Sequence, residues 1–243
     1  MKKNNMNNNI IEVNKIIEEI NLTKSDFVPF KKTLQIESLL LSSNSVEILN
    51  YHYSLLKIKE DAVLYMRIRS SFEERPKEII EPFLLNKLDE EKDISLKADV
   101  IQLLGSIKST KILPFIYKNI TSPIRDIRYR CIIVLGWIGN SKELPLLNER
   151  LVNDPDEELR EFGATAMRQI WFNHKKTSEE ITKYINKTIR NENSEKALIG
   201  MIITLQDLHR KKFGIKESQE GDISGDAIAA KAKAIKYLDT IFK

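Results

Sequence analysis

The chain has 243 residues, of which 42% are hydrophobic, so it can bury a core without metals, and its single cysteine cannot form an internal disulfide. Eight glycines and seven prolines leave few positions for tight turns, which favours long helices over a β-sandwich or barrel. The formal net charge of +4 is small beside a charged fraction of 30%, so charge alone does not indicate a nucleic-acid-binding protein.

The first segment of the chain is polar. Residues 1–9 are rich in asparagine and lack the apolar content that would offset the entropy of ordering them, so we expect a disordered tail. Asparagines and glutamates also stand where a secretory signal peptide needs an uninterrupted apolar run. The longest apolar stretches fall far short of the ~20 residues that span a bilayer. We therefore expect a cytoplasmic protein without a membrane-spanning segment.

Residues 10–75 contain two series of apolar residues near helical spacing. The first series is Ile10, Ile11, Val13, Ile16, Ile17 and Ile20, and the second is Val46, Leu49, Tyr53, Leu56, Val63, Leu64 and Ile68. We interpret this region as an N-terminal helical cap. The pattern leaves open whether the region continues the repeats that follow or folds separately.

Three segments further along the chain align with one another. KADVIQLLGSI, RYRCIIVLGWI and REFGATAMRQI start at Lys97, Arg128 and Arg160, which are 31 and then 32 residues apart. Their apolar residues form three columns: Leu103, Val134 and Ala166; Leu104, Leu135 and Met167; Ile107, Ile138 and Ile170. A shorter apolar helix and a polar turn precede each of the later segments. A two-helix repeat of this length predicts a stack of helix pairs with a shared core.

The predicted repeats cover residues 76–212, because the apolar pattern of 179–190 and 194–211 indicates a further, more divergent helix pair. Residues 213–225 are polar and contain glycines, so we expect a surface loop. Residues 226–243 predict a capping helix that covers the last apolar face. The predicted fold is all-α: a short α-solenoid of HEAT-like helix pairs with a helical N-terminal cap and a C-terminal capping helix.

SPIRDIRYRCIIVLGWIG and DPDEELREFGATAMRQI resemble the HEAT-like repeats of phycobilisome lyases and related solenoid proteins. That family has an Asp/Asn-Pro turn, an apolar-arginine pair, two small residues, and then Ala-Leu-Gly and Ile-Gly. The matching residues are Ile127-Arg128, Leu135-Gly136 and Ile138-Gly139 in one unit, and Asp154-Pro155, Leu159-Arg160 and Ala164 in the next. The upstream unit has a lysine at the arginine position. The resemblance implies that Arg128 and Arg160 contact an Asp or Asn of a neighbouring turn and serve the scaffold.

The chain shows no local signature of an enzyme. His52, His174 and His209 stand apart from one another and from Cys131, so the sequence predicts no metal site. It contains no GxSxG, GxxxxGK[ST] or GxGxxG motif, so we assign no catalytic residue and no cofactor. An enzyme built from dispersed residues is left open. Cys131 lies in an apolar run, where we expect it to be buried.

The outward positions of the second helices are the ones that repeat packing does not explain. They form one stripe on each helix: Ala98, Gln102 and Ser106; Tyr129, Ile133 and Trp137; Glu161, Thr165 and Gln169. Second helices line the concave side of a solenoid, so we expect these stripes to form a groove. The candidate partner-binding residues are Tyr129, Arg130, Ile133, Trp137, Glu161, Thr165, Gln169 and Gln102. The alternative is that Trp137 packs against the next helix and that Trp171 fills the repeat junction.

Two classes of function fit this pattern. The first is a non-catalytic module that binds a partner protein in the groove, for example a bacterial immunity or antagonist protein that occludes a toxin, which is an analogy at the level of fold. The alternative is a DNA-binding protein resembling the alkylpurine DNA glycosylases, which also stack HEAT-like helices. A duplex demands a continuous basic surface, and the expected groove has mixed charges. Attachment of a tetrapyrrole, as in the phycobilisome lyases, ranks third. The partner and the oligomeric state are left open.

Overall fold

The computed structural model describes residues 2–23 and 29–242, with side chains described at positions 7–22 and 29–242. The chain divides into two compact units, residues 1–107 (unit 1) and residues 108–243 (unit 2). The boundary between these units follows Ile107, whereas the sequence predicts the end of an N-terminal cap at residue 75. The first of the three aligned repeat segments therefore belongs to unit 1.

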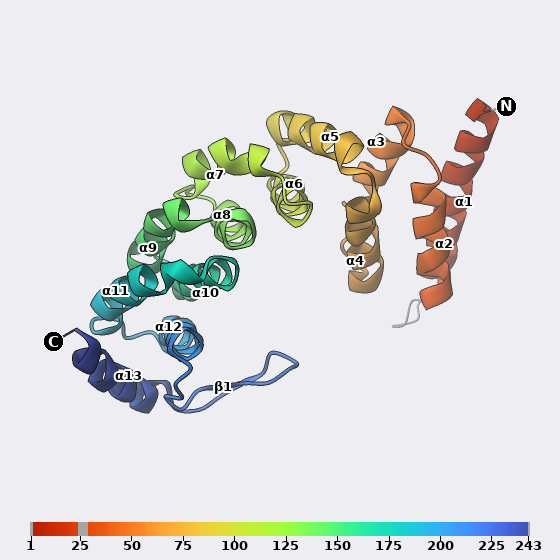
Figure 1. Ribbon diagram of the computed structural model, residues 1–243. Coiled ribbons are helices and arrows are strands. Elements are labelled where there is room, and N and C mark those ends of the chain that lie inside the picture. The colour runs from red at the N-terminus through yellow and green to blue at the C-terminus, as the bar shows by residue number, and fades with distance from the viewer. Residues whose placement is uncertain (1, 24–28, 243) are drawn as a thin grey trace. The chain divides into compact units, whose positions relative to one another are not determined.

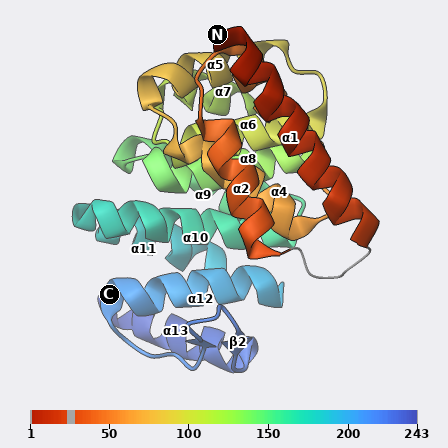
Figure 2. The same cartoon turned by 90° about the vertical axis from the view of Figure 1, so that its right-hand side faces the viewer.

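Unit 1 is built from helices that follow one another along the chain (Figure 2). They are α1 (Lys2–Thr23), α2 (Phe30–Leu41), α3 (Val46–Leu55), α4 (Ala62–Ser70), the 3-10 turn η1 (Ser71–Glu74), α5 (Lys77–Glu90) and α6 (Ile94–Ser106). Helix α1 packs against α2 and α3, and α5 packs against α6. Residues 2–9, expected as a disordered tail, are the first turns of α1. The anchored face that includes Val13 and Ile20 supports these turns, because extending a formed helix costs little.

The second apolar series of unit 1 forms two helices instead of one. Ser45 caps α3 by accepting a hydrogen bond from the Ile48 amide at 3.3 Å. Asp61 caps α4 in the same way, with its carboxylate 2.8 Å from the Leu64 amide nitrogen. The cap at Asp61 starts a new helix after the turn, and α4 packs against both α2 and α3.

Unit 2 is a succession of helix pairs followed by a hairpin and a last helix (Figure 1). Its elements are η2 (Thr110–Ile112), α7 (Leu113–Asn119), α8 (Arg125–Ile138), η3 (Ser141–Glu143), α9 (Leu144–Asn153), α10 (Glu157–Asn173), η4 (Lys175–Thr177), α11 (Ser178–Ile189), α12 (Glu195–His209), β1 (Lys216–Glu217), β2 (Ile223–Ser224) and α13 (Ala227–Ile241). Helices α8, α10 and α12 form one row, in which α10 packs against both neighbours, and α7, α9 and α11 form the other row.

The predicted core columns are largely confirmed. The buried members are Leu103, Leu104, Val134, Leu135, Ala166, Met167 and Ile170, each at most 1% exposed. Burying such a side chain stabilises the fold by roughly 1.5–3 kcal/mol. Ile107 and Ile138 are only half-buried, because Ile107 caps the end of α6 and Ile138 is the last residue of α8. In the third column, only Ile170 is fully buried.

The polar segment after α12 contains a short antiparallel hairpin, in which Lys216 pairs with Ser224. Gly225 follows the hairpin at φ +123°, a conformation that favours glycine, and Gly214 lies so close that a Cβ atom would not fit. Asp226 then caps α13 by accepting a hydrogen bond from the Ala229 amide at 2.9 Å. Helix α13 packs against α11 and α12.

The predicted fold class, an all-α solenoid of helix pairs, is confirmed, since the helices of each unit pack against their neighbours along the chain. Throughout the described ranges, every helix is too short or too polar to span a bilayer.

Candidate functional site

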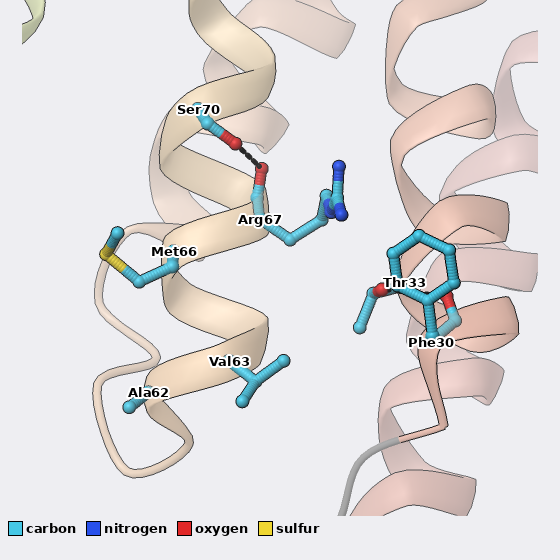
Figure 3. A pocket seen from close by; sticks show the side chains of 7 residues that line it. All are labelled: Phe30, Thr33, Ala62, Val63, Met66, Arg67 and Ser70. Atoms are coloured by element: carbon cyan, nitrogen blue, oxygen red, sulfur yellow. Dashed lines mark hydrogen bonds between the residues drawn. The ribbon is translucent and has the colours of Figure 1, made fainter. Parts of the chain in front are cut away.

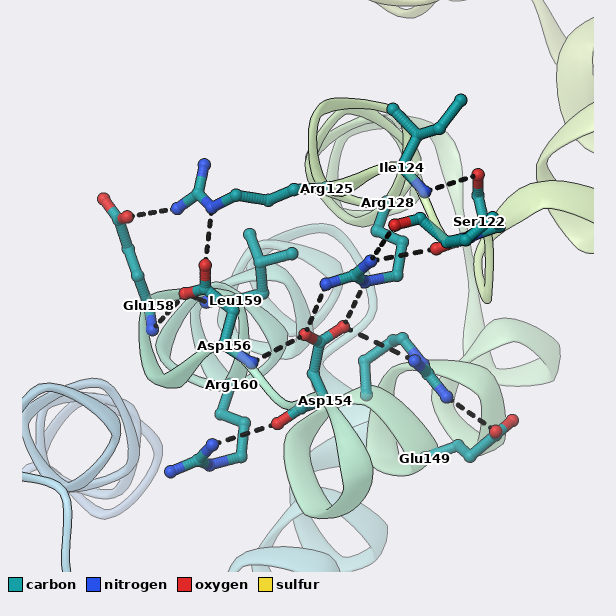
Figure 4. Close-up of polar contacts among 12 residues, drawn as sticks. Ser122, Ile124, Arg125, Arg128, Glu149, Asp154, Asp156, Glu158, Leu159 and Arg160 are labelled. Atoms are coloured by element: carbon teal, nitrogen blue, oxygen red, sulfur yellow. Dashed lines mark hydrogen bonds and ion pairs between the residues drawn. The ribbon is translucent and has the colours of Figure 1, made fainter.

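The repeated arginines of unit 2, Arg128 and Arg160, bond to acidic residues of the loops, and we call these contacts the arginine ladder. Figure 4 shows the contacts of Arg128. Asp154 has a fully buried carboxylate whose two oxygens lie 2.9 Å from Nε and 3.1 Å from Nη2 of Arg128. Arg150 approaches the same carboxylate at 3.4 Å. Nη1 of Arg128 also donates to the Ser122 carbonyl at 2.9 Å. Asp154 thus joins the ends of α8, α9 and α10.

Arg160 repeats this arrangement one unit later. Its Nε and Nη2 lie 2.7 Å and 3.1 Å from the carboxylate oxygens of Glu192, and its Nη1 donates to the Asp154 carbonyl at 2.9 Å. The expected contact of Arg128 with an acidic residue of a neighbouring turn is confirmed, and Glu192 takes the place of the Asp or Asn for Arg160. Both arginines therefore serve the scaffold.

Seven of the eight candidate residues lie in unit 2, on a surface formed by α8 and α10. We call it the α8–α10 surface, and it comprises Tyr129, Arg130, Ile133, Trp137, Glu161, Phe162, Thr165 and Gln169, all half-buried. The rings of Tyr129 and Phe162 lie 4.9 Å apart, and the Arg130 guanidinium stacks 4.9 Å from the Tyr129 ring. Phe162 was not predicted, although its position next to Glu161 on the outward side of α10 is a signal that could have identified it.

Trp137 lies at the end of α8 and remains partly exposed. The Lys108 ammonium is 5.8 Å from its ring centroid and donates to its carbonyl oxygen at 3.4 Å. Gln169 points toward α8, where Gly136 leaves room for its amide oxygen. That oxygen is buried without a hydrogen bond from the described residues. Gln169 is thus engaged in helix packing more than Trp137 is.

Glu161 lies at a close approach of α10 and α12. A Cβ atom on Gly200 would lie only 2.8 Å from the Glu161 carbonyl oxygen, so the two helix backbones are almost in contact. Burial, and then the nearby Glu158 carboxylate, raise the pKa of Glu161 above its usual range. Arg168, one turn along α10 from Thr165, pairs with Asp207 at 3.3 Å and with Glu217 of the hairpin at 3.0 Å. The sequence did not indicate that the hairpin is attached to α10.

Gln102 is the exception among the candidate residues, because it lies in unit 1. Its amide oxygen accepts a hydrogen bond from Arg69 at 3.2 Å. Ala98, one turn earlier on the same predicted stripe, is buried rather than outward-facing. The next residue, Asp99, accepts hydrogen bonds from Tyr65 and from Lys59 through its carboxylate. The prediction that these stripes form one groove stays a prediction.

The expectations that Trp137 packs against the next helix and that Trp171 fills the repeat junction both stay predictions. Trp137 is half-buried, as stated above, and so is Trp171. The Lys175 ammonium lies 3.3 Å from the centroid of the Trp171 ring, and the neighbouring Phe172 is 53% exposed.

Cys131, His52 and His209 lie in surroundings that suit packing rather than chemistry. Among the described residues, no three His, Cys, Asp or Glu side chains gather closely enough to hold a metal ion. Cys131 is buried, and burial raises the pKa of its thiol to about 12, so the reactive thiolate is strongly disfavoured. His209 contacts the Thr182 hydroxyl at 3.0 Å, and His52 lies in the core of unit 1.

A hollow between α2 and α4 was not predicted (Figure 3). It has a volume of about 470 Å³, and we call it the α2–α4 groove. Its lining residues are Phe30, Thr33, Ala62, Val63, Met66, Arg67 and Ser70. Val63 and Arg67 point from α4 toward Phe30 and Thr33 on α2. Only Val63 belongs to the apolar series that predicted these helices, because core-facing residues dominate such a pattern.

The helix pairs and the arginine ladder together define an α-helical repeat protein. Residues 81–168 match the family of HEAT repeats, a range that extends from α5 to α10. Over this range the chain is similar to HEAT repeats, in agreement with the helix pairs of the fold. No curated protein matches the sequence closely enough to count as a relative.

Proposed function

We propose that the chain is a non-catalytic module that binds a partner protein on the α8–α10 surface. The observation that carries this proposal is the pair of partly exposed rings of Tyr129 and Phe162, 4.9 Å apart, with Arg130 stacked on Tyr129. HEAT repeats are commonly protein-interaction modules, and all residues of this surface except Gln169 lie within the matched range. Arg128 and Arg160 are engaged in ion pairs within the fold, whereas the rings of Tyr129 and Phe162 keep exposed surface that a partner can cover.

The arrangement of these side chains favours tight binding. Aromatic and arginine side chains supply most of the energy at protein interfaces when a partner excludes water from them. Tyr129 contacts both Phe162 and Arg130, so its side chain is already restrained and loses little conformational entropy on binding. Glu161 beside them can pair with a cationic side chain of the partner.

Replacing Tyr129 or Trp137 with alanine should lower the affinity for the partner at least tenfold, since each substitution removes a ring that a partner would cover. The partner is obtained by affinity capture on the full chain from native cells, followed by its purification. Calorimetry with the purified partner then gives the dissociation constant of each variant.

Tyr184→Ala provides the matched control, because this half-buried tyrosine lies on α11 in the other row and its hydroxyl donates to Glu180 of the same helix at 2.9 Å. The control should bind like the unaltered chain. Equal affinities for Tyr129→Ala, Trp137→Ala and Tyr184→Ala would show that the proposed surface is wrong. The identity of the captured protein also tests the narrower prediction that the chain is an immunity protein, since a toxin would then be recovered.

The charges on this side of unit 2 support a protein partner over DNA. Arg125 bonds to both Asp156 and Glu158, and Arg168 bonds to two further carboxylates. The charges of Arg125 and Arg168 are therefore already balanced by carboxylates. A DNA duplex requires a continuous basic surface instead. We expect no mobility shift of duplex DNA by the chain at either low or moderate salt. A shift at low salt that moderate salt removes would favour the DNA-binding alternative.

A further inference from the structure

The second helices of unit 2 run in the same direction, so the loops that follow them lie at one edge of this unit. Near the start of both helices, a Cβ atom on Gly200 of α12 would lie 2.8 Å from the Glu161 carbonyl oxygen of α10. Near their ends, Arg168 of α10 pairs with Asp207 of α12 at 3.3 Å. Helix α8 is also parallel to α10, because their contacts join first half to first half and last half to last half. The loops after α8, α10 and α12 are therefore neighbours.

These three loops carry exposed cations. Lys142 follows α8, Lys175 and Lys176 follow α10, and Arg210, Lys211 and Lys212 follow α12; we call these six residues the basic edge. Within the described part of the chain, none of the six side chains forms an ion pair. By contrast, Arg125, Arg128 and Arg160, at the opposite ends of α8 and α10, all bond to carboxylates. The basic edge thus keeps its charge for a ligand.

The acidic residues next to the basic edge are engaged within the fold. Glu143 is only 3% exposed, because it closes the capping box of η3. In the first turn of α11, Glu179 pairs with Lys183 at 2.6 Å. Glu180 in the same turn accepts a hydrogen bond from the Tyr184 hydroxyl at 2.9 Å. The edge therefore has a positive net charge, and its complementary ligand is anionic.

A hollow opens within the basic edge where η3 meets η4. It has a volume of about 660 Å³, and its lining includes Ser141, Asn173, Lys176 and Glu180. Among the described residues, no hydrogen bond engages the Ser141 hydroxyl or the Asn173 side-chain amide. Both groups can therefore donate to a ligand beside the Lys176 ammonium, and carboxylate oxygens accept from all three. We call this feature the η3–η4 hollow.

The spacing of the three loops matches that of an extended peptide. The axes of packed helices lie roughly 8–10 Å apart, so the basic edge is about 20 Å long. A polyproline II segment rises about 3.1 Å per residue with three residues per turn. Every third side chain of such a segment lies on one face, at intervals of about 9 Å. Acidic side chains at this interval would meet one loop after another.

We propose that the basic edge binds an extended acidic segment of a partner protein, with carboxylates at every third residue facing the three loops. The carboxylate at the centre of the segment lies in the η3–η4 hollow, where Ser141 and Asn173 donate to it. This site is separate from the α8–α10 surface and does not require a partner there.

The aromatic rings at this edge favour an acidic peptide over single-stranded nucleic acid. The Lys175 ammonium lies 3.3 Å from the Trp171 ring centroid and 4.7 Å from that of Phe172. The Lys211 ammonium lies 4.1 Å from the Tyr237 ring centroid. Single-stranded nucleic acids gain much of their affinity by stacking bases on open ring faces, and lysines already cover these faces. The rings instead hold the two ammonium groups in place for carboxylates.

The η3–η4 hollow favours a flexible chain over a membrane or a DNA duplex. Both of these present broad surfaces, which would contact the outer lysines and leave the hollow unfilled. A side chain of a flexible segment can enter the hollow and reach Ser141 and Asn173. The hollow thus provides contacts that only the acidic segment uses.

Two labelled peptides of about ten residues test the proposal. Both have a proline-rich background, and one carries glutamate at every third position whereas the other carries lysine there. Fluorescence anisotropy with the full chain in 0.1 M salt should show binding of the glutamate peptide at least tenfold tighter than that of the lysine peptide. The double variant Lys142→Glu and Lys176→Glu should weaken binding of the glutamate peptide at least tenfold. It alters two of the loops without touching the lysines that stack on rings.

The double variant Lys118→Glu and Lys187→Glu provides the matched control, because it changes the net charge equally. Both lysines are exposed in the last turns of first helices, α7 and α11, which end at the opposite edge. Salt screens charges farther apart than about 10 Å, so this control should bind the glutamate peptide like the unaltered chain. Tyr129→Ala should also bind it normally, which separates this proposal from the α8–α10 surface. Thermal melts verify folding, and glutamine replaces glutamate at positions 142 and 176 if the charge reversal lowers the melting temperature.

Three outcomes would overturn the proposal. The first is equal affinity for the glutamate and lysine peptides. The second is an equal effect of the two double variants on the glutamate peptide. The third is a different occupant: the variant at Lys142 and Lys176 then abolishes binding to phosphatidylserine vesicles, single-stranded RNA or duplex DNA, while the glutamate peptide fails to bind.

Discussion

Asp154→Ala should lower the free energy of unfolding by about 3–5 kcal/mol, because it removes the carboxylate between two buried arginines. The Arg128 and Arg150 side chains are each only 8% exposed, and both contact Asp154. Without the carboxylate, two guanidinium groups remain in a site with little access to water. The Asp156 amide also loses an acceptor at 3.1 Å, at the start of α10. The loss should therefore exceed that of an ordinary surface ion pair.

Urea denaturation of Asp154→Ala, followed by circular dichroism, gives the required free energy. Asp207→Ala is the matched control, since Asp207 pairs with Arg168 at 3.3 Å but has a side chain that is 40% exposed. A surface pair of this kind contributes about 0–1 kcal/mol. If Asp154→Ala costs no more than Asp207→Ala, the ladder does not hold the repeats together.

The repeat core and the ladder could be predicted because local patterns determine them. Apolar residues at helical intervals mark the buried face of each helix, and the recurring arginine follows the same period. Leu135 and Met167 are buried as expected, and Arg128 meets the acidic residue of the next turn. Periodicity identifies the face of a helix but not the residue that faces it from another helix.

The features that were missed depend on contacts between distant segments. The pairing of Arg168 with Glu217 joins residues 49 apart in the sequence, and the hairpin has no pattern that indicates it. The contact of Phe162 with Tyr129 depends on the rotation of α10 relative to α8. The α2–α4 groove arises because two helices leave a hollow between them, which neither helix reveals alone. The spacing placed Ala98 on the outward side of α6, but Ala98 is buried, because the buried residues of α6 extend around more of that helix than one face.

A buried histidine in unit 1 makes the stability of the chain depend on pH. His52 stacks on Phe72 with ring centroids 3.7 Å apart, and its Nε2 lies 2.8 Å from the Ile68 carbonyl. Arg75 donates to Nδ1 of His52 at 3.2 Å and also donates to the Leu40 carbonyl at 2.7 Å. An arginine can only donate, so Nδ1 must accept and the imidazole is the neutral tautomer with its proton on Nε2.

Protonation of His52 would place a second positive charge against Arg75 inside the core. Burial, with a smaller contribution from the charge of Arg75, lowers the pKa of His52 to about 3, against an ordinary value of 6.5. The unfolded chain therefore binds a proton between these two values while the folded chain does not. The stabilising effect of the neutral ring is complete above pH 6.5 and is lost progressively as the pH falls toward 3.

Lowering the pH from 7 to 5 should accordingly reduce the free energy of unfolding by about 2 kcal/mol through His52 alone. Urea denaturation at half-unit intervals across this range measures the slope. His52→Gln should be less stable at pH 7 but lose less on acidification, because glutamine does not titrate. Partial burial also lowers the pKa of His209, which adds a decrease of the same sign in both proteins. Parallel slopes for the two proteins would show that His52 takes up its proton equally well folded and unfolded, so that neither burial nor Arg75 controls its charge.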